Sequence, residues 1–151
     1  MNDNINESNT FNTIGNIIFR IMSGLTLDLG FGMNYNNTQA KTFVQSLMPK
    51  NPTASRSSSE SIFLQNTNML TYSKTINNIH KFALTAAAEF QLQRNDYYMA
   101  AAADLLFPIL KYNNITLAKT YSLSNDFTKS TIGSYIGRVN YSLHDRYLIT
   151  L

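Results

Sequence analysis

Few side chains in this sequence are suited to catalysis or metal binding, and the two histidines are the main candidates. His80 and His144 lie far apart in the chain, and no serine or carboxylate is spaced to make them a catalytic pair or a metal site. The chain has no cysteine, which excludes disulfides, thiolate metal ligands and a cysteine nucleophile. It also lacks a glycine-rich phosphate loop. We therefore expect a protein that is not an enzyme and that holds no cofactor and no metal.

Aromatic side chains are better candidates for binding. Tyr97, Tyr98, Tyr112 and Tyr121 lie in a mixed segment that shows no clear periodicity. Carbohydrates and peptides stack on exposed rings, so these tyrosines are candidate contacts for a ligand or a partner protein. The alternative is that the rings have a packing role, against another loop of the chain or against a partner protein.

Three charged residues, Asp28, Glu89 and Arg138, lie in segments where apolar and polar residues alternate. This alternation would place all three on the wet face of a sheet. Arg138 could contact a substrate there. The alternative is a structural role, in which Arg138 forms a salt bridge to a neighbouring strand or to Glu89 or Asp28.

Apolar and polar residues alternate with a period of two through most of the sequence, a pattern that is typical of β-strands. It is clearest in residues 25–35, where large apolar residues from Leu25 to Tyr35 alternate with polar residues or glycine. The same period recurs in residues 15–21, 64–73, 81–93 and 134–143, and a sixth strand begins at Tyr147. Residues 22–24, 74–78 and 144–146 are expected to form short turns.

Two longer connections are predicted between these strands, at residues 36–61 and 94–129. The first is rich in Ser, Asn, Thr and Lys and contains two prolines, and the second carries the four tyrosines. Loops of this length are uncommon unless they are functional or disordered. Within the second, residues 100–106 could form a helical turn that ends at Pro108.

Connections that alternate between short and long are typical of outer-membrane β-barrels, with tight periplasmic turns and long extracellular loops. The 11 residues from Leu25 to Tyr35 match the roughly 9 to 11 that a tilted strand needs to cross a bilayer. Tyr35, Tyr72, Tyr141 and Tyr147 lie near strand ends, where aromatic girdles are found. The pattern favours an all-β, antiparallel up-and-down meander in a transmembrane barrel, with a soluble β-sandwich as the alternative.

Composition is consistent with this interpretation. Charged residues make up 14% of the chain, against about 25% in typical soluble domains. No window approaches the roughly 20 apolar residues of a transmembrane helix. The net charge is +3, but the basic residues are scattered, so nucleic acid is not an expected partner. The first ten residues lack the basic and apolar regions of a signal peptide, so none is expected.

The C-terminal residues resemble a known family. Residues 134–142 read SYIGRVNYS and residues 145–150 read DRYLIT. They are similar to the "SYFGRVNY…DRYLLT" signature of the SusC/RagA-type TonB-dependent outer-membrane proteins of the Bacteroidetes. Residues 23–27 resemble the family's "KGLTF" turn and strand, residues 68–74 its "NTLTYNKTF" strand, and residues 112–114 its "GYNNL" element. The resemblance extends from about Phe11 to Leu151.

This resemblance implies a receptor in the cell outer membrane that imports oligomeric nutrients, glycans or peptides. The partners implied are a SusD-like lipoprotein lid, TonB acting through a plug region, and membrane lipid. The chain has no counterpart of the family's plug domain, and about six strands are fewer than the eight of the smallest membrane barrels. Residues 1–151 are thus expected to form part of an incomplete receptor barrel, with extracellular loops at 36–61 and 94–129, and with Asp28, Glu89 and Arg138 facing the lumen.

Two other functions remain open from the sequence. The chain could be a soluble all-β module that binds a ligand, in which case its large apolar residues would form a buried core. It could also be a truncated gene remnant without activity of its own.

Overall fold

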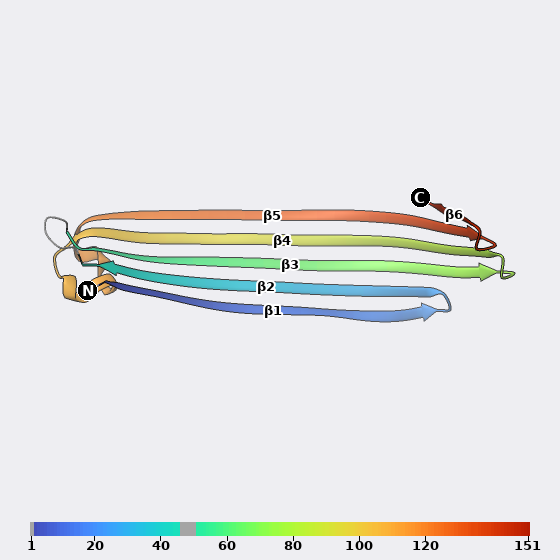
Figure 1. Ribbon diagram of the computed structural model, residues 1–151, viewed down its shortest axis with the longest axis horizontal. Coiled ribbons are helices and arrows are strands. Elements are labelled where there is room, and N and C mark those ends of the chain that lie inside the picture. Colours follow the sequence, from blue (N-terminus) through green and yellow to red (C-terminus); the bar gives the residue numbers. More distant parts are fainter. Residues whose placement is uncertain (1, 46–50) are drawn as a thin grey trace. The chain divides into compact units, whose positions relative to one another are not determined.

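The chain folds almost entirely into β-strands. The computed structural model describes residues 2–45 and 51–151. The strands are β1 (Asp3–Met22), β2 (Leu25–Val44), β3 (Thr53–Ile76), β4 (His80–Leu105), β5 (Ala118–Leu143) and β6 (Tyr147–Thr150). They form one antiparallel sheet in the order β1-β2-β3-β4-β5-β6, so each strand pairs with its neighbour in sequence (Figure 1). The sheet does not close, and the predicted all-β up-and-down meander is confirmed.

Within residues 2–45 and 51–151, helix is confined to one connection. Two 3-10 helices, η1 (Pro108–Asn113) and η2 (Ile115–Leu117), lie between β4 and β5. No helix in the part of the chain that the structure describes is long and apolar enough to span a membrane.

The hairpin turns are fixed by residues that tolerate positive φ. Gly24 has a φ of +83°, and a Cβ placed on it would lie 2.1 Å from the backbone oxygen of Ser73, so no other residue fits without a backbone shift. The two later turns have consecutive residues at positive φ, which are Asn77 and Asn78, then His144 and Asp145. A tight two-residue hairpin turn requires positive φ at both central residues, and among non-glycine residues Asn, Asp and His adopt positive φ most readily. The three predicted short turns are therefore confirmed, although β3 extends to Ile76 and the second turn falls at residues 77–79.

The two segments predicted as loops are mostly strand. β2 continues to Val44 and β3 begins at Thr53, while β4 continues to Leu105 and β5 begins at Ala118. Residues 46–50, within the first predicted loop, lie outside the described residues. The prediction is wrong elsewhere because Ser, Thr and Asn side chains here bond across neighbouring strands, so strand pairing persists without alternating hydrophobicity.

The helical turn predicted for residues 100–106 is also wrong. Residues 100–105 belong to β4, and Ala102 and Leu105 among them are buried. Alanine favours helix intrinsically, but a small side chain also lets another segment pack closely over a strand, and tertiary packing overrides the intrinsic preference.

Contacts divide the chain into two units. Unit 1 comprises Met1–Phe11, Asn34–Ile62 and Gln93–Lys129, and unit 2 comprises Asn12–Met33, Phe63–Leu92 and Ser130–Leu151. Unit 1 contains a small apolar cluster of Phe43, Ala54, Ala102 and Leu105, against which Tyr112, Ile115 and Ala118 pack.

Unit 2 instead displays its apolar side chains. The centroids of the Phe82 and Tyr141 rings lie 4.8 Å apart, and those of Phe90 and Tyr135 lie 6.0 Å apart in an edge-to-face arrangement. None of the buried apolar residues among those described belongs to unit 2. Large apolar side chains more than a third exposed on this face include Ile17, Phe19, Ile21, Phe31, Phe82, Leu84, Phe90, Tyr135 and Val139.

Candidate functional site

One face of unit 1 carries a ladder of uncharged polar side chains between β1 and β2. Their side chains bond in three cross-strand pairs, Thr42 to Asn4 (3.4 Å), Ser8 with Thr38 (3.1 Å) and Thr10 to Asn36 (3.3 Å). The two residue numbers of each pair add to the same value, as expected for one regular antiparallel register. The ladder therefore defines a single face of these two strands.

A second row of uncharged groups crosses β3, β4 and β5. The Ser61 hydroxyl donates to the Asn95 amide oxygen at 2.8 Å, and the Asn95 amide nitrogen donates to the Thr128 hydroxyl at 3.3 Å. Each of these polar groups thereby keeps a partner within the sheet. Each also retains further donor or acceptor capacity, because hydroxyls and amides can form more than one hydrogen bond.

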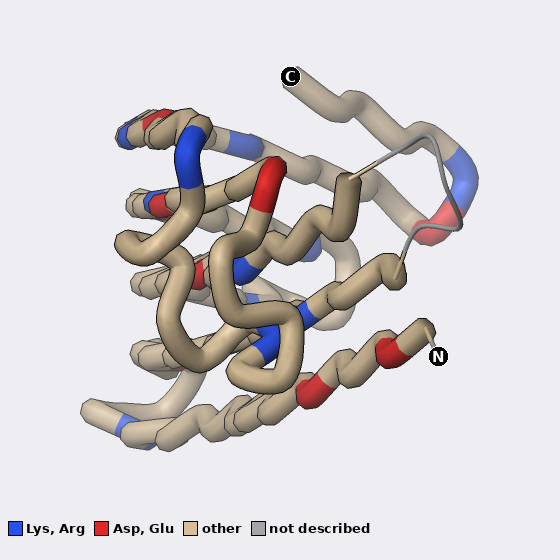
Figure 2. Tube along the Cα trace, turned by 90° about the vertical axis from the view of Figure 1, so that its left-hand side faces the viewer, with Lys and Arg blue, Asp and Glu red and all other residues tan. Residues whose placement is uncertain are grey.

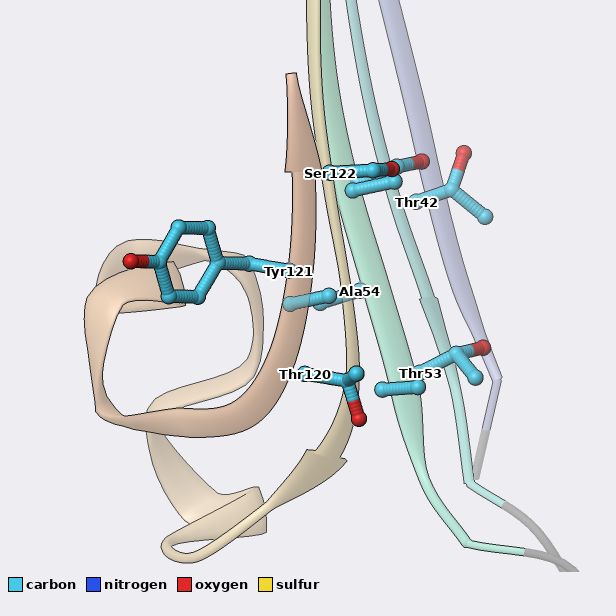
Figure 3. A pocket seen from close by; sticks show the side chains of 10 residues that line it. Thr42, Thr53, Ala54, Thr120, Tyr121 and Ser122 are labelled. Carbon is cyan, nitrogen blue, oxygen red and sulfur yellow. The ribbon is translucent and has the colours of Figure 1, made fainter.

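A hollow of about 380 Å³ lies between these strands. It is lined by Thr42, Thr53, Ala54, Ser55, Ala101, Ala102, Ala103, Thr120, Tyr121 and Ser122, none of which is charged. Thr42, Thr53, Thr120 and Ser122 project to one side of the strands, whereas the ring of Tyr121 and the methyl group of Ala54 project to the other (Figure 3). The hollow is therefore open on a surface of hydroxyl groups and alanine methyls.

We call this surface of unit 1 the neutral face. In each strand, every second residue points to this face, which is the side that carries the hydrogen-bonded side chains and the hollow. Its residues include Asn4, Ser8, Thr10, Asn36, Thr38, Thr42, Thr53, Ser55, Ser61, Asn95, Ala101, Thr120, Ser122 and Thr128. Most charged strand residues of unit 1 fall on the opposite side, and these are Asp3, Glu7, Lys41, Arg56, Glu60, Arg94, Asp96, Lys119 and Lys129.

Contacts on the opposite side support this division. Glu7 and Lys41 pair at 3.8 Å, and Arg94 pairs with Asp96 at 3.3 Å while lying 5.4 Å from the centroid of the Phe127 ring. Among the described strand residues of unit 1, Asp126 is the exception on the neutral face, while at Asp104 a φ of 58° interrupts the alternation. Residues of both signs are interspersed along the trace and do not gather by sign (Figure 2).

The opposite side is partly covered by the connection between β4 and β5, residues 107–117, which we call the strap. Lys111 has a φ of 50° and forms a 2.7 Å ion pair with Asp3 at the start of β1. The Tyr112 hydroxyl donates to the same Asp3 oxygen at 3.4 Å. The hydrogen bond from Lys111 lowers the pKa of the Asp3 carboxyl below its ordinary value of 3.8, and the same bond raises the pKa of Lys111 above 10.5.

The structure separates the four candidate tyrosines. Tyr97 lies on the neutral face, two residues from Asn95, and its hydroxyl bonds the Met99 sulfur at 3.3 Å. Tyr98 and Tyr121, which are 58% and 65% exposed, lie on the opposite side. Tyr112 belongs to the strap, where it packs against the apolar cluster. Tyr121 lines the hollow but its ring projects to the opposite side, so of the four tyrosines Tyr97 is the one whose ring lies on the same side as the hollow.

The three predicted lumen residues lie in unit 2, on the side away from its aromatic pairs. Glu89 accepts hydrogen bonds from Gln65 at 2.9 Å and from Gln91. Asp28 shares this side, because it is two residues from Gly30, whose missing Cβ would face Thr67. Arg138 is exposed, and within the described residues no ion pair joins it to Glu89 or Asp28. The predicted salt bridge is therefore wrong.

The sequence prediction missed the hollow, although a signal for it was present. Hydroxyl residues occupy every second position from Thr53 to Ser61, as one face of a strand requires. The described residues contain no group of three or more His, Asp or Glu side chains that could hold a metal ion. The arrangement thus offers many neutral donors and acceptors and one aromatic ring.

His80 and His144 have structural positions. His80 Nδ1 lies 2.7 Å from the Tyr141 hydroxyl, and the two rings stack with centroids 6.0 Å apart. His144 occupies a positive-φ turn position, and its backbone N–H donates to the Ile79 carbonyl at 2.9 Å.

Comparison with known proteins gives similarity in structure alone. No protein-family model matches the sequence, and no curated protein sequence matches it. Solved structures that align over 99% of the chain include the RagAB peptide transporter, with a TM-score of 0.87 and 18% sequence identity. They also include the RagAB peptide importer in its closed-closed state (TM-score 0.88, 18% identity) and in its open-open state (TM-score 0.86, 19% identity). The chain spans 17% of the length of each matched chain. At this identity the likeness concerns the fold, and the six-stranded meander is one that occurs within peptide transporter chains.

Proposed function

We propose that the chain is part of the wall of an outer-membrane β-barrel that takes up oligomeric nutrients. Unit 2 would lie against bilayer lipid, and unit 1 would lie in water on the outer side. The proposal has support from the sequence resemblance to SusC/RagA-type receptors and from the fold likeness to chains of a peptide transporter.

The observation that carries the proposal is the uncovered apolar side of unit 2. Burying a large apolar side chain is worth roughly 1.5 to 3 kcal/mol. Phe31, Phe82 and Phe90 remain 50%, 37% and 43% exposed, and no buried core of unit 2 collects them among the described residues. A soluble module would leave this stabilisation unused, whereas lipid would supply it.

Strand length also favours this assignment. β1 to β5 are 20 to 26 residues long, about twice the 9 to 11 that a tilted strand needs to cross a bilayer. Strands of this length would extend well beyond the membrane, as unit 1 is proposed to do.

The implied partners belong to the proposal as well. Uptake would be driven by TonB through a plug region, and a SusD-like lipoprotein would cover the outer opening. The chain would contribute wall and outer surface, with no catalytic role. The three polar residues Asp28, Glu89 and Arg138 would face the lumen.

A lipid-quenching experiment tests the membrane assignment. The chain contains no tryptophan, so Phe90→Trp introduces a single fluorophore on the apolar side of β4 and Ala87→Trp introduces one on the other side. In vesicles of phospholipids brominated along the acyl chains, we expect strong quenching at position 90 and weak quenching at position 87. Equal quenching at both positions, or none at position 90, would rule out a lipid-facing side.

A further inference from the structure

The neutral face suggests the chemical class of ligand that unit 1 accepts. We propose that this face, from the hollow to Tyr97, binds an uncharged oligosaccharide. The inference rests on the proposed function in that uptake would bring such a ligand to this surface, but the binding itself can be measured separately.

The hydrogen-bonding groups of the face match those of a sugar. A sugar hydroxyl both donates and accepts, so it needs partners that can do the same. Serine and threonine hydroxyls have both capacities, and an asparagine amide offers one group of each kind. Thr42, Thr53, Ser55, Thr120 and Ser122 surround the hollow with such groups, and its volume of about 380 Å³ lies within the range of roughly 300 to 1,000 Å³ typical of small-ligand sites.

The absence of charge along the hollow disfavours ionic ligands. A charged group that leaves water without gaining an opposite charge loses solvation that neutral hydroxyls do not fully replace. No residue that lines the hollow is charged, and the cations adjacent in sequence to its lining residues, Lys41, Arg56 and Lys119, belong to the other side of their strands. A free peptide carries an ammonium and a carboxylate at its ends, so it would lack partners for both.

Tyr97 extends the surface and adds a stacking platform. It lies four residues from Ala101 along β4, a separation of about 13 Å at 3.3 Å per residue. Apolar sugar faces pack on aromatic rings while the ring edge remains hydrated. A ligand that reaches both the hollow and Tyr97 must therefore be extended, which indicates an oligosaccharide and not a single sugar.

Calorimetric titration of the detergent-solubilised chain tests the ligand class. The probes are the neutral hexasaccharides maltohexaose, cellohexaose and xylohexaose, the anionic hexamer of galacturonic acid, and the zwitterionic peptide hexaglycine. We expect at least one neutral hexasaccharide to bind at least tenfold more tightly than either charged probe. Tighter or equal binding of galacturonate or hexaglycine, or binding of no neutral hexasaccharide, would overturn the proposal.

Two neighbouring tyrosines provide a matched pair of variants. Tyr97→Ala should weaken binding of the neutral hexasaccharide about tenfold, whereas Tyr98→Ala, on the opposite side of β4, should leave it unchanged. Circular dichroism of both variants checks that the strands are retained. Equal effects of the two substitutions would contradict a role for the neutral face.

A variant that gains affinity for an anionic ligand tests the site without the ambiguity of a variant that loses binding because it misfolds. Ser55→Lys places a cation in the hollow, so galacturonate binding should rise at least tenfold while binding of the neutral hexasaccharide falls. Arg56→Gln removes a charge one residue away on the other side and should change neither. An unchanged ligand preference in Ser55→Lys would show that the hollow is not the site.

The two proposals can fail separately. Quenching by brominated lipid without sugar binding would retain the barrel assignment and reject the ligand class. Sugar binding without quenching would retain the neutral face as a sugar site and reject the membrane assignment.

Discussion

Asp3 and Lys111 form a 2.7 Å ion pair that ties the strap to the first strand. The strap leaves β4 and packs on Phe43 of β2, Ala54 of β3 and Ala102 of β4 before this ion pair attaches it to β1. One carboxylate thereby holds both Lys111 and Tyr112. The attachment secures the side of unit 1 that lies opposite the neutral face.

The Asp3→Asn substitution should loosen the strap. The amide removes the charge that pairs with Lys111, while the apolar cluster beneath the strap remains. We expect faster trypsin cleavage after Lys111, because a protease needs a locally detached segment. Glu7→Gln is the matched control, since Glu7 lies in β1 as Asp3 does but pairs with Lys41 of β2. Equal cleavage rates in Asp3→Asn and the parent chain would show that the ion pair does not hold the strap.

Strap attachment should depend on pH at both extremes. The folded pKa of Asp3 is lowered from 3.8, so its contribution is complete above that value and is lost as the pH falls through the lowered pKa. The folded pKa of Lys111 is raised from 10.5, so its contribution is complete below that value and is lost as the pH rises through the raised pKa. Hydrogen exchange of residues 107–117, corrected for the intrinsic rate at each pH, should therefore show constant protection from pH 5 to 9 and reduced protection below 3.8. A loss of protection near pH 6 would point to another group.

The first hairpin should not tolerate a side chain at its turn glycine. A Cβ on Gly24 would meet the Ser73 oxygen at 2.1 Å, and its φ of +83° is unfavourable for alanine. We expect Gly24→Ala to lower the free energy of unfolding by about 1 to 3 kcal/mol, as residues forced into such backbone conformations do. Gly15→Ala is the control, because a Cβ there meets nothing within 4 Å. Urea denaturation followed by circular dichroism measures both, and similar midpoints would contradict the expectation.

Removal of the Tyr141 hydroxyl should weaken unit 2 while retaining its ring contacts. The Tyr141→Phe substitution deletes the hydrogen bond with His80 but leaves the ring against Phe82. A loss of about 0.5 to 1.5 kcal/mol is expected, the usual net value of one such bond. Tyr135→Phe is the comparison, because Tyr135 contacts Phe90 through its ring and is 78% exposed. Urea midpoints that shift equally in both variants would assign the effect to the rings.

Alternating hydrophobicity predicted the parts of the fold in which one side of a strand is apolar. Residues 25–35 and 81–93 were identified as strands for this reason, and the short turns followed from the breaks between such segments. Alternating hydrophobicity does not indicate a strand where both sides of the strand are polar. From Thr53 to Ser61 every odd position is a serine or threonine, while the even positions are mixed and include Arg56 and Glu60. A hydropathy scale scores serine and arginine both as polar, so it does not detect this pattern.

The candidate site was less predictable than the fold. Tyr97 and Tyr98 are adjacent and chemically identical, so composition could not indicate which of them shares a surface with the hollow. That distinction depends on strand register, which the bonds of Asn95 to Ser61 and Thr128 reveal. Tyr112 was identified as an aromatic of interest, but its contact with Asp3 joins residues separated by 109 positions, which no local pattern indicates.

The large sequence separation between the strap and Asp3 affects the order in which the chain folds. Every strand pairs with its sequence neighbour, so each hairpin can form from its own turn, and contacts of low sequence separation form quickly. The strap can reach Asp3 only after β2, β3 and β4 have aligned beneath it. We therefore expect the Asp3–Lys111 ion pair to form late in folding, so that its loss would speed unfolding while leaving the folding rate nearly unchanged.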